Sequence, residues 1–237
     1  MVVKPQMQTT RTVSFNSLRA SVFRAIAGQD YENGFILDLS PLPTRKLIIS
    51  APIAAAISKF RCDSPSLAHI NPLIAEITGV PPRGGVLCAM WYIVNDLFDV
   101  MSVTGGQPLD HVYDIGSGLG LHAALLNSKW VSLHEVANDR NATARTLFND
   151  NGIESFSINA PPEAPADILC SFLACGYLFP LADYLPHMRL SKRALLDLNK
   201  RYAGPKADAV INTFPKKTAM RDDGVGVNIF TRTLLSR

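Results

Sequence analysis

The sequence has few cysteines and no long uninterrupted run of apolar residues. No two of its four cysteines form a CxxC pair, which argues against a zinc cluster, so we expect reduced thiols and no metal site. The most apolar segment, residues 85–103, is interrupted by Asn95, Asp96 and Asp99, which argues against a membrane span. Reduced thiols in a chain without a membrane span predict a cytoplasmic protein.

Charge of neither sign dominates the chain. Lysine and arginine number 23 and the acids 20, which leaves a net charge of +3. A mildly basic chain can bind an anion, but this balance alone does not indicate a nucleic-acid-binding domain. With 237 residues and 47% hydrophobic side chains, the sequence can build one large α/β domain, or one domain with a substantial extension.

The first 15 residues lack the apolar centre of a secretory signal. They are polar, and their two charged residues, Lys4 and Arg11, are both basic. We expect a flexible tail here, and an organelle-targeting segment is the open alternative.

Prolines and glycine pairs divide residues 1–105 into short segments. The segment GVLCAMWYIVNDLFDVM at 85–101 has apolar residues at helical spacing over a wide face, which predicts a buried helix. Further helices are expected at 53–60 and 66–77, with a short strand or hairpin at 31–39. The expected N-terminal region is therefore mainly helical, and we assign it to an acceptor pocket or cap.

From about residue 109, short apolar strands alternate with helices. Strands are expected at 111–115, 130–136, 155–158, 166–172, 207–214 and 228–235, and helices at 121–127, 141–149 and 190–202. This order predicts an α/β domain over 106–237 with a doubly wound, mostly parallel sheet. Few residues separate 214 from 228, so the last helix must be short or missing. The exposed sheet edge would then be covered by the N-terminal region or by a second copy in a homo-oligomer.

The first strand of this domain runs into a glycine-rich turn, DIGSGLG at residues 114–120. Glycines let the backbone turn tightly and approach a ligand, and the following helix offers free N–H groups. Dinucleotide-binding turns have the spacing GxGxxG, whereas the glycines here follow GxGxG. Asp114 would repel a pyrophosphate but suits the ammonium group of a methionine moiety. The turn therefore favours a cofactor that contains methionine over a dinucleotide.

The stretch VYDIGSGLG at 112–120 resembles the first motif of the class I S-adenosylmethionine (SAM)-dependent methyltransferases, a strand ending in Asp/Glu-x-Gly-x-Gly-x-Gly. The resemblance covers about residues 109–237. It implies a Rossmann-like methyltransferase fold, methyltransferase activity and S-adenosyl-L-methionine as cofactor. It also implies that the turn binds this cofactor through Asp114, Gly116, Ser117, Gly118 and Gly120.

In this family, further cofactor contacts come from the ends of the next strands. An acid after the second strand holds both ribose hydroxyls, and Glu135 is in register for this role, with Asp139 as the alternative. After the third strand the family has Asp and a small residue against the adenine, whereas this chain has Asn159 and Ala160. Asn departs from the pattern but can still hydrogen-bond an adenine edge. The fourth strand of the family ends near the reactive methyl, where we expect Ser171.

The segment that follows, residues 171–187, is expected to supply catalytic residues. Its string CGYLFPLADYL is similar to a segment of sugar O-methyltransferases, which implies O-methylation of a small molecule such as a sugar or secondary metabolite. A general base helps when the acceptor is a hydroxyl, and imidazole exchanges protons near neutral pH. His187 is therefore the first candidate base and Tyr177 the second. Cys175 has no evident base beside it, which disfavours a cysteine nucleophile.

Two other functions are open alternatives to a small-molecule acceptor. The first is an RNA or cap methyltransferase, viral or cellular. The Asn/Asp-Pro-Pro-Tyr/Phe motif of N-methyltransferases is absent after the fourth strand, as is the Asp of the Lys-Asp-Lys-Glu tetrad of RNA ribose methyltransferases. The basic pairs at 192–193 and 200–201 are typical of a solvated helix face. The second alternative is a SAM-binding domain without catalysis. No membrane partner is expected.

Overall fold

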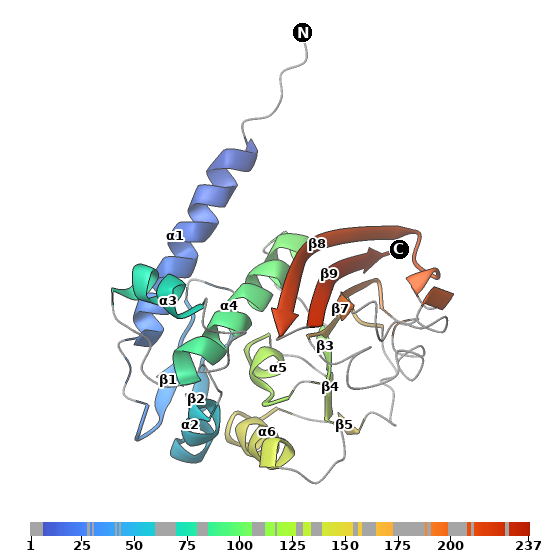
Figure 1. The fold of residues 1–237 in the computed structure, drawn as a ribbon. Coiled ribbons are helices and arrows are strands. Elements are labelled where there is room, and N and C mark those ends of the chain that lie inside the picture. Colours follow the sequence, from blue (N-terminus) through green and yellow to red (C-terminus); the bar gives the residue numbers. More distant parts are fainter. Residues whose placement is uncertain are drawn as a thin grey trace.

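A computed structural model gives the fold of the chain (Figure 1). It describes residues 7–27, 29, 31–40, 42, 44–59, 70–79, 85–105, 112–116, 118–126, 130–133, 139–153, 156–157, 165–172, 188, 191–198, 208–209, 211–225 and 228–237. Over these residues, every helix is too short or too polar to cross a lipid bilayer.

A seven-stranded sheet in the order β5-β4-β3-β6-β7-β9-β8 is the framework of the C-terminal half. Its strands are β3 (Val112–Ile115), β4 (Trp130–Leu133), β5 (Phe156–Ser157), β6 (Ile168–Ser171), β7 (Arg193–Leu198), β8 (Lys216–Val225) and β9 (Asn228–Ser236). The first five strands in this order are parallel, and β9 and β8 form an antiparallel hairpin at the edge. The order reverses direction beside β3, and ligands of open α/β sheets bind at such a point, beyond the carboxyl ends of the strands.

The central strands are apolar because they are covered on both faces. Every residue of β3 and of β6 is buried, so neither strand shows the alternation of a half-exposed strand. Helix α5 (Leu121–Leu125) leads away from β3, and α6 (Asp139–Asp150) separates β4 from β5. This arrangement confirms the predicted α/β class with a mostly parallel sheet.

The N-terminal half is mainly helical, as predicted. It consists of α1 (Met7–Ala27), a hairpin of β1 (Phe35–Leu37) and β2 (Leu47–Ile49), α2 (Ala51–Ser58), α3 (Ile70–Thr78) and α4 (Gly85–Thr104). Figure 1 shows α1 extending away from the rest of the molecule, while α4 runs beside the sheet domain. Helix α4 packs on α5, and α2 packs on α6. One hydrophobic cluster runs from Val22 through these helices to Ile153, so the two halves share a core.

The start of α1 corrects the prediction of a flexible tail over the first 15 residues. Residues from Met7 onward are helical. The segment lacks an apolar stripe, which is why its sequence did not indicate a helix.

Two elements near the C-terminus also differ from prediction. The expected helix at 190–202 contains strand β7, whose residues Ala194, Leu195, Leu196 and Asp197 are all buried. A strand buried on both faces is a continuous apolar run, and periodicity cannot distinguish such a run from a buried helix.

The expected strand at 207–214 is instead a short helical turn, in which the amide of Asn212 donates to the carbonyl of Asp208 (2.8 Å). Ile211 and Phe214 are buried, and this burial rather than strand pairing explains the apolar pattern. The space before the last strand holds β8, which pairs with β9 and forms the reversed hairpin typical of the resembled family.

Candidate functional site

The glycine turn follows β3 directly and has the conformation that its sequence predicts. Gly116, Gly118 and Gly120 have φ angles of 69°, 55° and 79°, in the left-handed region that side chains disfavour. A Cβ atom added to Gly120 would lie 2.5 Å from Cζ of Phe148 on α6, so only glycine fits there. A Cβ on Gly118 would meet no atom within 4 Å, so the turn has an open side where a ligand can approach its backbone.

Asp114 lies at the end of β3, beneath this turn, and its carboxylate is not satisfied. The residue is 2% exposed, and its Oδ2 atom has no hydrogen-bond partner among the residues that the structure describes. Burial raises the pKa of Asp114 to about 6, with His122 acting to lower it and Asp96 to raise it. A buried carboxylate without a partner is costly, and such groups are normally hydrogen-bonded. The geometry therefore fits a ligand that brings a cationic hydrogen-bond donor.

A buried ionic network lies at the same edge of the sheet. Arg232 on β9 pairs with Asp197 on β7 through two bonds, Nε to Oδ1 at 2.8 Å and Nη2 to Oδ2 at 2.7 Å. Its Nη1 atom donates to Asp96 and to Asp99 (2.8 Å), both on α4. Burial alone would lower the pKa of Arg232, but Asp96 and Asp197 raise it above its usual range. The network joins the N-terminal helix α4 to both C-terminal strands.

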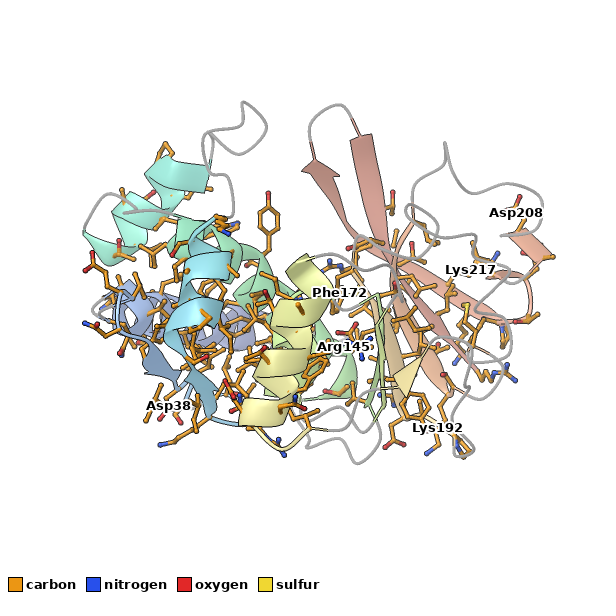
Figure 2. All side chains as sticks on the ribbon, turned by 90° about the horizontal axis from the view of Figure 1, so that it is seen from below. Asp38, Arg145, Phe172, Lys192, Asp208 and Lys217 are labelled. Carbon is orange, nitrogen blue, oxygen red and sulfur yellow. The ribbon has the colours of Figure 1, made fainter. Side chains whose placement is uncertain are left out.

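His122 on α5 extends this network toward the end of β6. Its Nε2 atom lies 2.7 Å from Oδ2 of Asp96. Burial by itself would raise the pKa of Asp96, but Arg232 and the hydrogen bond with His122 outweigh it and hold that pKa below its usual value. The ring of His122 packs at 4.9 Å against Phe172, the residue after β6, and Arg232 lies 4.6 Å from the centre of the same ring. Figure 2 shows Phe172 between the N-terminal helices and the sheet.

These side chains give the site an acidic character. Among the described side chains of the cluster, four are carboxylates (Asp96, Asp99, Asp114 and Asp197), and their cationic counterpart is Arg232, with His122 as the remaining titratable member. A cationic ligand would improve this balance.

Ser171 lies one strand away from Asp114. Its side chain is fully buried, and its Oγ atom donates to the carbonyl of Ile115 at 3.1 Å. This bond ties the end of β6 to the end of β3, just before the glycine turn. Ser171 therefore positions the backbone beside the expected cofactor site.

The described site residues Asp114, Gly116, Gly118, Gly120 and Ser171 thus come together at the carboxyl edge of the sheet. The other predicted site residues lie outside the described residues: Ser117, Glu135, Asn159, Ala160, Tyr177 and His187. The strands that precede Glu135 and Asn159, β4 and β5, follow β3 in order in the sheet.

Sequence reasoning missed the group formed by Asp96, His122, Asp197 and Arg232. Three signals were available: acids within the otherwise apolar helix α4, a histidine two residues after the last glycine of the turn, and an arginine within the apolar last strand. None of them by itself indicates a partner. The pairing depends on contacts between distant parts of the chain.

No family model and no curated protein matches the sequence. Several solved structures are similar in fold. The N-terminal domain of human METTL16 in complex with SAH is 17% identical, covers 71% of this chain and 80% of its own, and has a TM-score of 0.43. The human methyltransferase 10 domain-containing protein is 15% identical. The match covers 77% of this chain and 95% of that protein, with a TM-score of 0.43. The ribosomal protein L11 methylase from Lactobacillus delbrueckii subsp. bulgaricus is 15% identical. The match covers 60% of this chain and 78% of that protein, with a TM-score of 0.36.

The architecture of the chain itself defines its class. A mostly parallel sheet, an acid at the end of β3, three left-handed glycines directly after it, and an antiparallel hairpin at the sheet edge make up a Rossmann-like α/β fold.

Proposed function

We propose that this chain is a SAM-dependent methyltransferase that methylates a hydroxyl group of a small molecule. The observation that supports it best is the unsatisfied carboxylate of Asp114 beneath the open glycine turn. The α-ammonium group of SAM is a cationic donor of the kind that this carboxylate lacks.

The residues at the turn fit this cofactor. Asp114 would accept a hydrogen bond from the methionine ammonium, and the backbone at Gly116, Gly118 and Gly120 would lie against the methionine moiety. Glu135 is proposed for the ribose hydroxyls, and Asn159 with Ala160 for the adenine. When bound, SAM supplies a methyl group on a positively charged sulfonium. The chain needs to align an acceptor with that methyl and to exclude water.

The charge of the site supports a small molecule over a nucleic acid as acceptor. Among the described side chains at the carboxyl edge of the sheet, four carboxylates face the single arginine Arg232. The excess charge there is negative, which disfavours a phosphodiester backbone. Nucleic-acid binding would instead require a cluster of lysines and arginines beside the cofactor. Three exposed lysines are described on or beside the sheet: Lys192 directly before β7, and Lys216 and Lys217 at the start of β8. Figure 2 shows Lys192 and Lys217 away from Phe172.

Helix α4 is proposed to form one wall of the acceptor pocket. It brings Asp96 and Asp99 to the same edge of the sheet as Asp114, although it belongs to the N-terminal half. A pocket between α4 and the strand ends would give the N-terminal region its role as a cap.

Calorimetry with SAM and its demethylated product SAH tests the cofactor site. The wild-type chain should bind both, and Asp114→Asn should lose about 10- to 100-fold in affinity, because a hydrogen bond to a charged group contributes roughly 1.5–3 kcal/mol. Asp208→Asn removes an exposed carboxylate far from Phe172 (Figure 2) and should leave affinity unchanged. If neither compound binds the wild type at millimolar concentration, the proposed function is wrong.

Transfer of a labelled methyl group tests the acceptor class. The chain and labelled SAM are incubated with a metabolite extract and, separately, with an RNA pool. We expect a labelled small molecule in the metabolite extract and no label in the RNA. Labelling of RNA alone would support the nucleic-acid alternative. Binding of SAM without labelling of either pool would support a non-catalytic SAM-binding domain.

A further inference from the structure

Within the ionic network, one side chain is both oriented by a carboxylate and incompletely buried. The side chain of His122 is 17% exposed, whereas those of Arg232 and Asp96 are 1% and 5% exposed. Among the described residues, His122 forms one hydrogen bond, between its Nε2 atom and Oδ2 of Asp96, and its ring packs against Phe172. Within the described part of the chain, the second ring nitrogen, Nδ1, therefore has no hydrogen-bond partner.

Asp96 determines which nitrogen carries the proton. Its carboxylate is held in the ionised form by Arg232, and it also accepts the hydrogen bond from His122. An ionised carboxylate can only accept, so Nε2 of His122 is the protonated nitrogen. In neutral imidazole the other nitrogen, Nδ1, then has a free lone pair and can accept a proton. An acid that orients an imidazole in this way is the arrangement of a general base.

His122 lies beside the strand end at which the proposed function expects methyl transfer. Its ring contacts Phe172, which follows the last residue of β6, and its helix α5 begins directly after the last glycine of the turn. The imidazole therefore lies close to the end of β6, the strand end that the family resemblance places near the reactive methyl. Other nucleophilic or titratable groups described there are less suited. Cys170 is fully buried, and burial raises the pKa of its thiol well above the usual value.

We propose that His122, oriented by Asp96, is the general base that takes the proton from a hydroxyl acceptor. The proposal rests on the SAM site proposed above. As the acceptor oxygen attacks the methyl carbon, the bond from that carbon to sulfur breaks. Its electron pair stays on sulfur, and SAH departs as a neutral thioether. The hydroxyl proton passes to Nδ1 of His122 and is later released to water. The products are a methyl ether, SAH and a proton.

The proposal also defines the acceptor class. A hydroxyl is a weak nucleophile at neutral pH and gains most from a base, whereas a neutral amine needs little help. The pair formed by His122 and Asp96 therefore favours an alcohol or phenol over an amine as acceptor. Asp96 acts through His122 and is a positioning residue.

His122→Gln is the test variant, because the glutamine amide can still donate to Asp96 from the place of Nε2 but cannot accept a proton. It should bind SAM within about twofold of the wild-type affinity, and the labelled methyl ether should form at least about 100-fold more slowly. Wild-type transfer should slow as the pH falls, because a protonated imidazole accepts no further proton. Measured with SAM saturating at every pH, so that the titration of Asp114 does not limit binding, this acid limb should be missing in His122→Gln. Asp96→Asn should also slow transfer, whereas Asp208→Asn should not.

A second measurement needs no acceptor. Nitrogen-15 spectra of the histidine side chains at about pH 8, assigned with His122→Gln, should show Nε2 protonated and Nδ1 unprotonated in the wild-type protein. Protonation at Nδ1 would overturn the proposal.

The other outcomes separate the two proposals. If the wild type binds no SAM, the proposed function fails as well. If SAM binds but the labelled product is an amine, or neither pool is labelled, the SAM site stands and the base is wrong. If His122→Gln transfers the methyl group at the wild-type rate and with the wild-type pH profile, His122 is not the base.

Discussion

Asp114 shows how one residue links binding to stability. Burial raises its pKa from the ordinary value of 3.8 to about 6. The folded chain therefore holds a proton between these pH values that the unfolded chain has already lost. Raising the pH from about 4 to 6 should lower the free energy of unfolding by up to about 3 kcal/mol through this residue.

Urea unfolding of the wild type and of Asp114→Asn without SAM measures this effect. Asparagine cannot ionise, so the variant should gain stability relative to the wild type as the pH rises through this range. Parallel profiles for the two proteins would show that Asp114 is not a strained carboxylate. With SAM present the loss of stability should be smaller, because the ionised form of Asp114 binds the ammonium, and affinity should rise as the pH rises toward about 6.

Arg232 illustrates the opposite case of a buried charge that is fully paired. Its side chain is 1% exposed and contacts three carboxylates. Arg232→Met would leave these acids without a cation, and breaking a buried ionic group costs roughly 3–5 kcal/mol. Lysine keeps the charge but cannot form the paired bonds to Asp197, so Arg232→Lys should lose less.

Chemical denaturation checks this prediction at the residue scale. Arg145→Met removes an exposed arginine on α6 (Figure 2) and should change the free energy of unfolding by less than about 0.5 kcal/mol. A comparably small loss for Arg232→Met would mean that the network does not stabilise the fold.

At the scale of elements, the glycine turn joins β3 to α5 and depends on α6 as well. Alanine at position 118 would be strained by its left-handed φ but would meet open space, whereas alanine at 120 would also contact the ring of Phe148. Left-handed strain costs about 1–2 kcal/mol and overpacking typically another 1–3 kcal/mol. Gly120→Ala should therefore be the more destabilising of the two substitutions.

Thermal unfolding of Gly118→Ala, Gly120→Ala and the double variant Gly120→Ala with Phe148→Leu tests this. The smaller leucine should restore part of the loss at position 120. No rescue would mean that backbone strain alone explains the cost.

Elements were predicted well where their patterns are local. The helix at 85–101 and the strand at 111–115 correspond to α4 and β3, because helical spacing and a strand running into glycines are visible in the sequence. β7 was taken for a helix because its residues are buried without alternation. β8 was missed because Lys216 to Val225 is largely polar and forms a strand only by pairing with β9.

At the scale of the whole molecule, the helical half and the sheet domain share one hydrophobic cluster and one ionic network. We therefore expect them to unfold together. The two tryptophans lie one in each half, Trp91 on α4 and Trp130 on β4. Trp130→Phe leaves Trp91 as reporter for the helical half, and Trp91→Phe leaves Trp130 as reporter for the sheet.

Each variant is unfolded in urea and followed by tryptophan fluorescence and by circular dichroism. For each variant the two signals should change over the same range of urea concentration. Coincident transitions are expected for a single cooperative unit. A sheet reporter that unfolds at a clearly different urea concentration from the helical signal would indicate two independent domains.

The sequence by itself determined the α/β class and the glycine turn. Asp114 and the three glycines lie within seven consecutive residues, and the turn needs only their local conformational preferences. The tertiary structure alone decided the proposed base and the charge of the site. His122 meets Asp96 across 26 positions and Asp96 meets Arg232 across 136, so no local pattern encodes these contacts. They exist because α4 packs beside α5 and because the last strand returns antiparallel beside β7.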